Sequence, residues 1–515
     1  MSHEPGARHP LKLPFTDNPW FAAATLLVAG ALQTLTLSPF HFWWLGPVSV
    51  FLILMVAVHQ APGRLFLSGW LTGVGLFASG ASWIYVSISE HSNTPAAIAV
   101  VLMVLFIAGV ALFHALAFWF WGKLAKDSPV RRLLLFPAIW VLGDWLRSWL
   151  LTGFPWLYLG TGHVDGPLGG LAPLTGVHGI TFWITVTGVA AYGAWWLWRE
   201  SRQKTAGAVV ALTLLPWFVA PAMKQADWTE MSDEPISVAA MQGNIPQRIK
   251  WNPEFMRDQI VTYLGMTENH WQADIVLWPE TAIPITQDEA GKIIDHINSQ
   301  LGDNSTLITG IPWYGYSEQV EDFTFHNSIM ATGNGEGMYH KQKLVPFGEY
   351  VPLAGLLRGL ISFFDLPMSN FTPGPDYQKP LKANGINVMP YICYEVAYPD
   401  FVAFNARNAG LLVTISNDGW FGDSIGPQQH LQMARMRALE TGRYMLRGTN
   451  NGVTAIINEK GEITERIPQF ERDVLTGEAY TAEGQTPYMQ TGSWPVLTLA
   501  VILVVFVRER VIPKN

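Results

Sequence analysis

The chain has 515 residues, a length that allows two or three domains. Its apolar fraction is 49% and its charged fraction is 14%, against about 25% in ordinary soluble domains, which excludes a disordered chain and argues against a wholly soluble enzyme. A net charge of −8 argues against broad nucleic-acid binding, and the single cysteine, Cys393, excludes an internal disulfide framework and a cysteine-rich metal cluster.

The charged residues are unevenly distributed along the chain. Residues 13–222 hold 15 of them, whereas residues 223–492 hold 50. Sixteen of the 23 tryptophans precede residue 223, as expected for rings at bilayer interfaces. We therefore predict a membrane domain over residues 1–222, a water-soluble domain over 223–492, and a last span with a short tail over 493–515.

Apolar stretches near the length that a bilayer demands, about 20 residues, predict eight spans. They lie near 20–37, 43–59, 65–87, 95–121, 133–152, 171–197, 206–222 and 493–507. The segment before residue 20 lacks a cleavable signal pattern, so we expect the first span to be an uncleaved anchor.

Lysine and arginine in the short connections predict the orientation of these spans. One side collects Arg8, Lys12, Arg64, Lys123, Lys126, Arg131, Arg132, Arg199, Arg202, Lys204, Arg508, Arg510 and Lys514. The opposite connections, 38–42, 88–94 and 153–170, contain neither residue type. The basic side is expected to be cytoplasmic, which places residues 223–492 outside that membrane.

Asp144 and Arg147 lie three residues apart inside the fifth predicted span and share a helix face. Two interpretations remain open at this stage. They form a neutralised structural pair, or they contact a lipid headgroup, since charges inside spans are usually functional.

From Ile236 onward, short β-rich runs alternate with helical stretches. The runs are ISVAAMQG, ADIVLWPE, STLITGIPW, INVMPYICYE and GLLVTISND, the helices 254–272, 288–300 and 426–442, and a hairpin-like pair turns near Asn334-Gly335. This alternation predicts a layered α/β domain. GDSIG matches the nucleophile-elbow pattern, but its strand ends several residues earlier, so Ser424 is interpreted as a loop residue before a helix. No phosphate loop or metal-binding spacing is present, and neither metal nor cofactor is expected.

Three residues at predicted strand ends could carry chemistry. Cys393 ends the apolar run VMPYIC, where a lone cysteine is either a small buried hydrophobe or a nucleophile. Glu280 ends IVLWPE, where it is either a solvated loop residue or a partly desolvated base. Lys341, with Lys343, follows a strand in YHKQKLVPFGEYVP, and it is either solvated or a cation that stabilises a thiolate and an oxyanion.

Taken together, Glu280, Lys341 and Cys393 resemble the Glu-Lys-Cys triad of the nitrilase, or carbon–nitrogen hydrolase, superfamily. The flanking sequences are WPE, YHKQKLVPFGE, ICYE and NDGWFGDS, joined by QGNIPQRIKW and IGPQQHLQMARMRALETGRYMLRGTNNG. With seven spans before this domain and one after it, the chain resembles the bacterial apolipoprotein N-acyltransferase family over nearly its whole length.

This resemblance implies an α-β-β-α sandwich of nitrilase type on the periplasmic side of the bacterial inner membrane. It implies acyl transfer from a phospholipid, through a thioester on Cys393, to the α-amino group of a diacylglyceryl-cysteine at the N-terminus of an apolipoprotein. Glu280 would act as base, and Lys341, with backbone N–H groups near Tyr394, would bind the oxyanion. By the same resemblance Glu349 and Glu395 support the site, and the residues that line the substrate path are Trp251, Tyr394, Trp420 and Phe421.

Water would hydrolyse a thioester, so transfer to an amine needs a site that excludes water and meets lipid. Segment 350–372, rich in leucine and phenylalanine, predicts an arm on the membrane surface, or else an internal amphipathic helix. Two other functions fit parts of this pattern. A membrane-anchored amidase would need an open aqueous pocket, and a transporter or sensor with a ligand-binding outer domain would not need Cys393.

Overall fold

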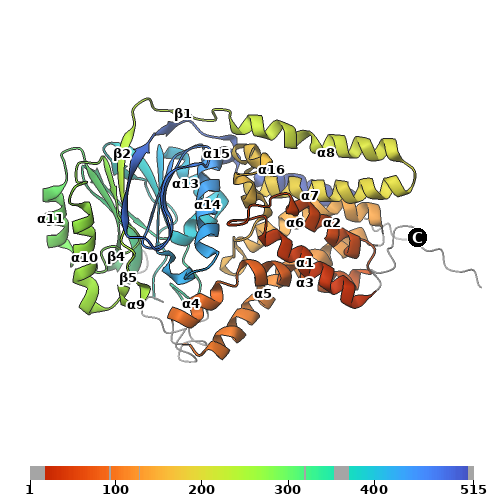
Figure 1. Ribbon diagram of the computed structural model, residues 1–515, viewed down its shortest axis with the longest axis horizontal. Coiled ribbons are helices and arrows are strands. Elements are labelled where there is room, and N and C mark those ends of the chain that lie inside the picture. Colours follow the sequence, from red (N-terminus) through yellow and green to blue (C-terminus); the bar gives the residue numbers. More distant parts are fainter. Residues whose placement is uncertain (1–17, 92–93, 127, 318–320, 353–369, 509–515) are drawn as a thin grey trace, which may run out of the picture.

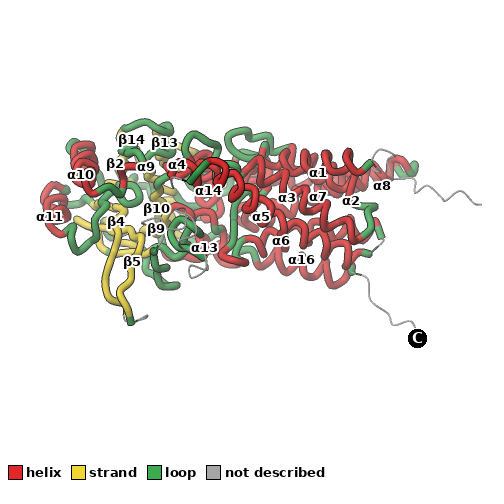
Figure 2. The backbone as a smooth tube through the Cα atoms, turned by 90° about the horizontal axis from the view of Figure 1, so that it is seen from below, coloured by secondary structure: helices red, strands yellow, loops and turns green. Residues whose placement is uncertain are grey.

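A computed structural model describes residues 18–91, 94–126, 128–317, 321–352 and 370–508. A helical half and a half built around β-sheets lie end to end along the long axis (Figures 1 and 2). Most of the predicted arm, 353–369, lies outside the described residues. Its flanks meet in an antiparallel bridge between Tyr350 and Asn370, and the Phe371 ring stacks on Phe325 with centroids 4.7 Å apart.

In the described part of the helical half, eight α-helices precede the sheets and one long helix follows them. They are α1 (Pro19–Thr34), α2 (Leu45–Ala57), α3 (Pro62–Gly80), α4 (Ile84–His91), α5 (Ala96–Ala125), α6 (Pro129–Arg147), α7 (Ala172–Arg199), α8 (Gln203–Lys224) and α16 (Trp494–Val507). Each predicted span coincides with helical residues. The turn between α7 and α8 lies at the end of this half that is remote from the sheets (Figure 1).

Length and hydropathy support fewer complete spans than the predicted eight. Among the described residues, three helices are long and apolar enough to cross a membrane: Ala96–Ala125, Pro167–Arg199 and Gln203–Lys224. A fourth arises if α3 and α4, which meet at a 55° bend, form one broken span. Helices α1, α2 and α16 are apolar but shorter, and α6 carries Asp144 and Arg147. Membrane-crossing helices are therefore supported, and the count of eight stays a prediction.

Small residues allow the helices around α3 to approach closely. A Cβ atom on Gly30 of α1 would collide with the Thr72 carbonyl of α3, and one on Gly75 of α3 would collide with Leu27 of α1. Helices in lipid have no hydrophobic driving force for association, so the van der Waals contacts made at these glycines stabilise the packing instead.

Asp144 and Arg147 form a buried ion pair, with 2.8 Å between Arg147 Nη2 and Asp144 Oδ1. The other terminal nitrogen of Arg147 donates to the Phe154 and Trp156 carbonyls, each at 2.6 Å. Because both side chains are at most 4% exposed and Arg147 holds the chain after α6, the structure favours the structural role over a headgroup contact.

The other half contains two large sheets and a small two-stranded one. The six-stranded sheet has the order β14 (Asp473–Ala479), β2 (Ile236–Gln242), β3 (Ile275–Leu277), β4 (Thr306–Ser317), β5 (Asp322–Gly333) and β7 (Met338–His340). The seven-stranded sheet has the order β13 (Ile463–Ile467), β12 (Thr454–Ile457), β11 (Met445–Thr449), β10 (Leu411–Ser416), β9 (Ile386–Ile392), β8 (Leu381–Ala383) and β6 (Gly335–Glu336). Strands β1 (Glu230–Met231) and β15 (Ala482–Glu483) pair separately.

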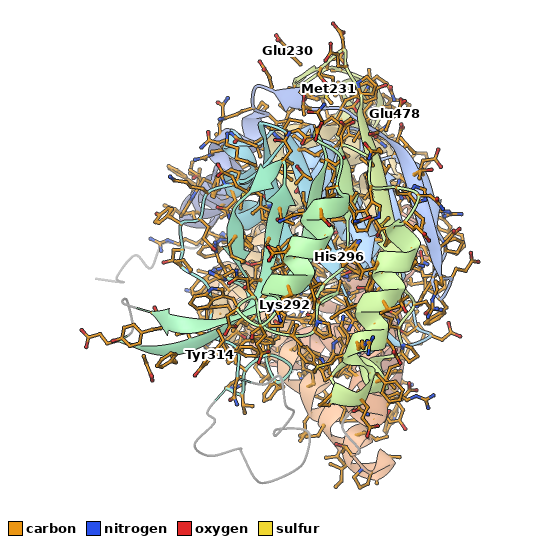
Figure 3. All side chains as sticks on the ribbon, turned by 90° about the vertical axis from the view of Figure 1, so that its left-hand side faces the viewer. Glu230, Met231, Lys292, His296, Tyr314 and Glu478 are labelled. Carbon is orange, nitrogen blue, oxygen red and sulfur yellow. The ribbon has the colours of Figure 1, made fainter. Side chains whose placement is uncertain are left out.

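Alternate residues of the strands face two different cores. Val238 and Leu277 of the six-stranded sheet pack with Val413 and Ile415 of the seven-stranded sheet in one buried cluster. On the outer face of the six-stranded sheet lie α10 (Pro253–Thr267) and α11 (Gly291–Gln300), the latter marked by Lys292 and His296 in Figure 3. On the other face of the seven-stranded sheet lie α13 (Pro399–Asn405) and α14 (Gly426–Thr441), next to the helical half (Figure 1).

The five predicted strand runs coincide with β2, β3, β4, β9 and β10, and the three predicted helices with α10, α11 and α14. The expected hairpin differs in detail. After Asn334 the chain forms β6, which joins the other sheet, before β7 returns to pair with β5 at Ser328 and His340. A longer hairpin, β4–β5, was not predicted, and Figure 3 shows its tip projecting beside Tyr314.

Candidate active site

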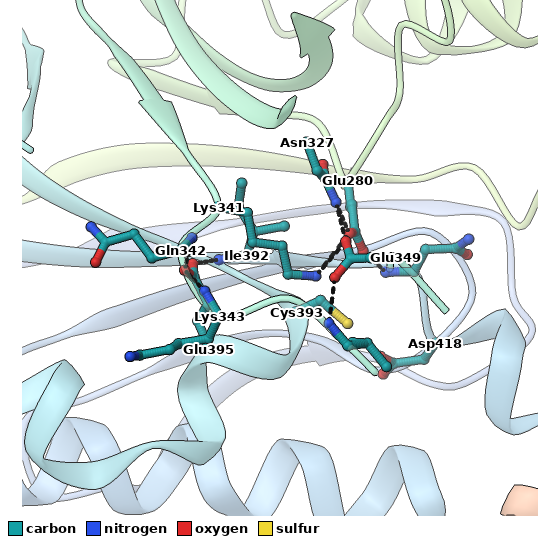
Figure 4. Close-up of polar contacts among 12 residues, drawn as sticks. Glu280, Asn327, Lys341, Gln342, Lys343, Glu349, Ile392, Cys393, Glu395 and Asp418 are labelled. Carbon is teal, nitrogen blue, oxygen red and sulfur yellow. Dashed lines mark hydrogen bonds and ion pairs between the residues drawn. The ribbon is translucent and has the colours of Figure 1, made fainter. Parts of the chain in front are cut away.

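Three polar residues meet where strands of both sheets end. Glu280 follows β3, Lys341 follows β7 and Cys393 follows β9. Glu280 is 8% exposed, Lys341 is 1% exposed, and Cys393 is partly buried. The structure thus brings together the three residues that the sequence singled out (Figure 4). Their catalytic roles remain a proposal.

Lys341 lies between two carboxylates. Its Nζ is 2.8 Å from Glu349 Oε1 and 3.7 Å from Glu280 Oε1. Burial by itself lowers the pKa of Lys341, but the charges of Glu349 and Glu280 outweigh burial and raise that pKa above its ordinary value. The lysine is therefore a permanent cation beside the thiol.

Two groups donate hydrogen bonds to the Glu280 carboxylate, one to each oxygen. Asn327 Nδ2 donates to Glu280 Oε1 at 2.7 Å and to Glu349 Oε1 at 2.9 Å, so that one amide bridges both carboxylates. The Asn417 backbone N–H donates to Glu280 Oε2 at 2.9 Å. These contacts fix the carboxylate of Glu280 in one orientation.

Cys393 begins a short 3₁₀ helix, Cys393–Ala397, directly after β9. Its φ of 52° lies in the left-handed region, which a residue with a Cβ atom rarely adopts. A strained strand-to-helix turn of this kind presents a nucleophile beyond the end of its strand. Ser424, by contrast, lies in the loop before α14, where its hydroxyl accepts from the Gly426 N–H at 3.2 Å.

The electrostatic surroundings of Cys393 keep it protonated. Burial raises the pKa of the thiol well above its usual value, and the negative charge of Glu280 adds to this effect. Lys341 acts in the opposite direction without reversing the result. The resting residue is therefore a thiol, and any attack by sulfur requires a base to remove its proton.

Glu395 connects the loops that carry Lys341 and Cys393. Its carboxylate accepts from the Ile392 N–H and the Gln342 N–H, each at 2.7 Å, and from the Tyr339 hydroxyl at 2.9 Å. Burial raises the pKa of Glu395 to about 7, although these backbone donors oppose the shift. Figure 4 shows Glu395 on the side of Lys341 away from the thiol, where it can position both loops.

Three of the four aromatic residues predicted on the substrate path face the helical half. Tyr394 stacks on Trp156 at 6.3 Å, Phe421 contacts Trp83 edge-on at 4.7 Å, and the Trp420 carbonyl accepts from the Ser87 hydroxyl of α4 at 2.8 Å. The fourth, Trp251, follows the short helix α9 (Gln247–Lys250). Their role along a substrate path stays a prediction.

A cavity of about 700 Å³ lies between the two halves. Its lining includes Trp145 of α6, Trp149 just after that helix, and Gln342, Lys343 and Tyr398 from the half built around the sheets. The cavity therefore borders the segment that follows Lys341. The four aromatics named above are not among its lining residues.

Sequence reasoning missed several polar residues of the site. Lys250 Nζ donates to the Glu280 carbonyl at 2.6 Å, and burial lowers the pKa of this lysine to about 8 while Glu280 and Cys393 oppose the shift. Asn327 and Asn417 hold Glu280 as described. Lys250 and Asn417 lie in runs quoted above, and Asn327 lies inside β5. None of these positions carries a sequence signal of its own.

No three His, Cys, Asp or Glu side chains lie close enough together to hold a metal ion in the part of the chain that the structure describes. The reactive groups of the site are a thiol, a fixed carboxylate and a buried cation. That combination can support nucleophilic attack on a carbonyl carbon, removal of the thiol proton and stabilisation of an oxyanion.

Comparison with known proteins agrees with this chemistry. The family model for carbon-nitrogen hydrolases matches residues 237–485, which cover both large sheets and the site, so this half is a carbon–nitrogen hydrolase domain. A second model, described as the apolipoprotein N-acyltransferase N-terminal domain, matches residues 29–191 of the helical half.

Curated relatives extend the similarity over both halves together. Apolipoprotein N-acyltransferase of Pseudomonas syringae pv. tomato is 47% identical over 487 residues, covering 94% of this chain and 96% of the relative. The proteins of that name from Pseudomonas putida and Photobacterium profundum are 44% and 39% identical, and cover 94% and 95% of this chain and 96% and 97% of their own lengths. The chain belongs to the apolipoprotein N-acyltransferase family, and it is an acyltransferase.

Proposed function

We propose that this enzyme transfers a fatty acyl chain from a membrane phospholipid, through a thioester on Cys393, to the α-amino group of an N-terminal diacylglyceryl-cysteine on an apolipoprotein. The observation that carries the proposal is the left-handed turn at Cys393 beside the buried Lys341–Glu349–Glu280 cluster. Membership in the acyltransferase family weighs against a transporter or sensor.

In the first half-reaction, Glu280 takes the proton of Cys393 as sulfur attacks the ester carbonyl of the phospholipid. The S–C bond forms, and the carbonyl oxygen becomes an oxyanion that the Lys341 cation stabilises. The C–O bond to glycerol then breaks, and the proton on Glu280 passes to the departing oxygen. The products are a lysophospholipid and an acyl thioester.

In the second half-reaction, the neutral α-amino group attacks the thioester carbonyl and Glu280 accepts a proton from that nitrogen. The second oxyanion forms at the same place, so Lys341 stabilises it in the same way. Collapse breaks the C–S bond, the thiolate recovers the proton from Glu280, and an amide remains on the acceptor. No cofactor takes part in this scheme.

The membrane setting follows from both substrates, whose acyl chains are anchored in lipid. We place the enzyme in the bacterial inner membrane with eight spans, and its catalytic domain, an α-β-β-α sandwich, on the periplasmic side. The basic residues Arg199, Arg202 and Lys204 support this orientation, because they surround the α7–α8 turn remote from the sheets (Figure 1). Reporter fusions after Trp228 and at the C-terminus should report opposite sides, and the same side for both would refute the topology.

The cavity between the halves supports access from lipid to the site. It lies between the tryptophan-rich end of α6 and the loop of Lys343. Trp251, Tyr394, Trp420 and Phe421 are proposed to guide the acyl chains toward Cys393, since the rings of Tyr394 and Phe421 contact Trp156 and Trp83 of the helical half. Excluding water along this route protects the thioester from hydrolysis.

The decisive experiment is the mass of the Cys393 peptide after the purified enzyme is incubated with phospholipid vesicles. An added acyl group on Cys393, lost when a diacylglyceryl-cysteine peptide is added and recovered on that peptide's amine, is expected. Release of the acyl group as free fatty acid at an equal rate with or without the amine would indicate a hydrolase instead. Absence of any adduct on Cys393 would refute the mechanism.

A further inference from the structure

A second cluster of buried polar residues lies behind Cys393, and the mechanism above does not use it. Asp418 follows β10, His430 lies on α14, and Arg447 lies on β11. All three side chains are at most 1% exposed. Because β9, β10 and β11 run parallel, the residues after β9 and β10 and the end of β11 gather at one edge of the sheet.

The hydrogen bonds of His430 join this cluster to the nucleophile. Its Nε2 lies 3.0 Å from the backbone carbonyl of Cys393, and its Nδ1 lies 3.0 Å from Asp418 Oδ1. A carbonyl oxygen only accepts, so Nε2 must carry a proton and donate it. Trp156 of the helical half packs on the other side of the same ring, with centroids 5.7 Å apart.

Asp418 is ionised and doubly bound. Burial raises its pKa, but Arg447 and His430 outweigh burial and bring that pKa down to about 2. Arg447 Nη2 donates to the second oxygen, Oδ2, at 2.7 Å. Arg447 Nη2 also lies 3.2 Å from His430 Nδ1, so Asp418 and Arg447 together hold the imidazole ring in a single orientation.

The carbonyl that His430 holds belongs to the residue with the strained backbone. Cys393 has a φ of 52°, a conformation that persists only where the surroundings impose it. The hydrogen bond from Nε2 is a side-chain restraint on the peptide group after Cys393, and its loss would loosen that group. The sulfur would then move relative to the charged groups that face it, namely Glu280, Lys341, Glu349 and Asp418.

We propose that His430, fixed by Asp418 and Arg447, is a positioning residue that clamps the Cys393 carbonyl and holds the thiol in its reactive geometry. This inference rests on the proposed function in assigning the nucleophile to Cys393. It assigns His430 no contact with substrate and no proton transfer. Misplacement of a nucleophile by about 1 Å costs on the order of 100-fold in rate, which sets the size of the expected effect.

Two substitutions separate the hydrogen bonds of His430. In His430→Gln, the side-chain amide nitrogen reaches the place of Nε2 and can still donate to the Cys393 carbonyl. In His430→Asn, the amide reaches only the place of Nδ1, so that the contact with Asp418 can persist while the clamp is lost. Gln429→Leu is the matched control, because Gln429 neighbours His430 on α14. This substitution removes the 2.7 Å hydrogen bond that Gln429 accepts from Trp156 Nε1, and it leaves the contact with Cys393 in place.

Alkylation by iodoacetamide reports on Cys393 alone, since the chain has one cysteine, and it requires no lipid. Alkylation rates across pH, acyl-enzyme formation from phospholipid vesicles and thermal unfolding should be measured for all variants. We expect His430→Asn to slow acyl-enzyme formation about 100-fold and to move the alkylation profile to higher pH. His430→Gln should remain within about threefold of the parent rate, and Gln429→Leu should lower stability without moving the profile.

Equal acyl-enzyme rates for folded Gln and Asn variants would overturn the proposal. If the Asn variant does not fold, the Gln variant decides, since a 100-fold loss in a folded protein that keeps the clamp would also overturn it. Failure of the proposed function is recognised separately. The parent enzyme would then form no acyl adduct. The clamp would still be tested by whether the alkylation profile of His430→Asn lies at higher pH than those of the parent and His430→Gln.

Discussion

Two clusters of buried charge lie in different halves of the molecule and have similar ion-pair geometry. In α6, Arg147 pairs with Asp144 at 2.8 Å; in the catalytic half, Lys341 pairs with Glu349 at 2.8 Å. The remaining partners differ. Arg147 donates to two main-chain carbonyls, whereas Lys341 has a second carboxylate, Glu280, and a thiol beside it. Burial of charge does not by itself identify chemistry; the presence of a reactive group among the neighbours does.

The largest effect that this comparison predicts is at the thiol. Cys393→Ala should abolish acyl-enzyme formation, because no other side chain in the cluster can form the thioester. Loss of a small, partly buried group should change the free energy of unfolding by only about 1 kcal/mol. The measurements are the acyl adduct by mass spectrometry and the melting temperature in detergent. Retained acyl transfer to the lipopeptide amine would disprove covalent catalysis.

Glu280→Gln should preserve the fold and slow thioester formation by about 10²–10⁴-fold, since an amide cannot accept the thiol proton. Because burial raises the pKa of Cys393, the thiolate fraction grows only at alkaline pH, so the residual rate of this variant should increase as the pH rises. Rapid-quench measurement of the acyl-enzyme across pH checks both statements. A normal rate at neutral pH would transfer the role of base to Glu349 or Glu395.

Arg147→Met tests the other side of the comparison. It leaves Asp144 buried without its partner, which should destabilise the protein by about 3–5 kcal/mol while the acyl-transfer rate per folded molecule stays unchanged. The double variant with Asp144→Leu should recover much of the stability. Thermal unfolding beside activity per folded enzyme is the measurement. Full stability combined with impaired use of phospholipid would instead favour a headgroup contact for this pair.

Glu349→Gln should lower stability by about 1.5–3 kcal/mol, because it weakens a buried hydrogen bond between two charged groups. It should also slow acyl-enzyme formation, because Lys341 would then pair with Glu280 and make that carboxylate a weaker base. The effect should be smaller than that of Glu280→Gln. Comparing the two variants under identical conditions checks the order. A larger defect in Glu349→Gln would contradict the proposed division of roles.

The smallest effect is expected for Tyr339→Phe, which removes one of the donors to Glu395. Three backbone N–H groups still bind that carboxylate, so the expected loss is about 1 kcal/mol with a small change in rate. Denaturant or thermal unfolding against the parent is sufficient. A loss comparable to that of Glu349→Gln would show that the hydroxyl does more than complete the set of donors.

Much of the fold and the centre of the site could be predicted because they depend on local pattern. Short β-rich apolar runs predicted β2, β3, β4, β9 and β10, and charge-poor stretches predicted the helical half. Glu280 and Cys393 were found because each follows such a run, although β3 and β9 belong to different sheets and only the packing of the two sheets brings their ends together. The length of individual helices was less predictable: the bend between α3 and α4 interrupts a continuous apolar stretch.

From the sequence alone we could predict two halves, one helical and one built around sheets, and select Glu280, Lys341 and Cys393 as candidate base, cation and nucleophile, because hydropathy and strand ends are local properties. The polar groups that hold those three residues could be identified only in the folded chain. Asn417 meets Glu280 across 137 positions and His430 meets Cys393 across 37, because a buried donor or acceptor is satisfied by whatever partner the paired strands bring within reach. The same holds for Arg147. Its structural role could be assigned only from its partners, which are Asp144 and the main-chain carbonyls of Phe154 and Trp156.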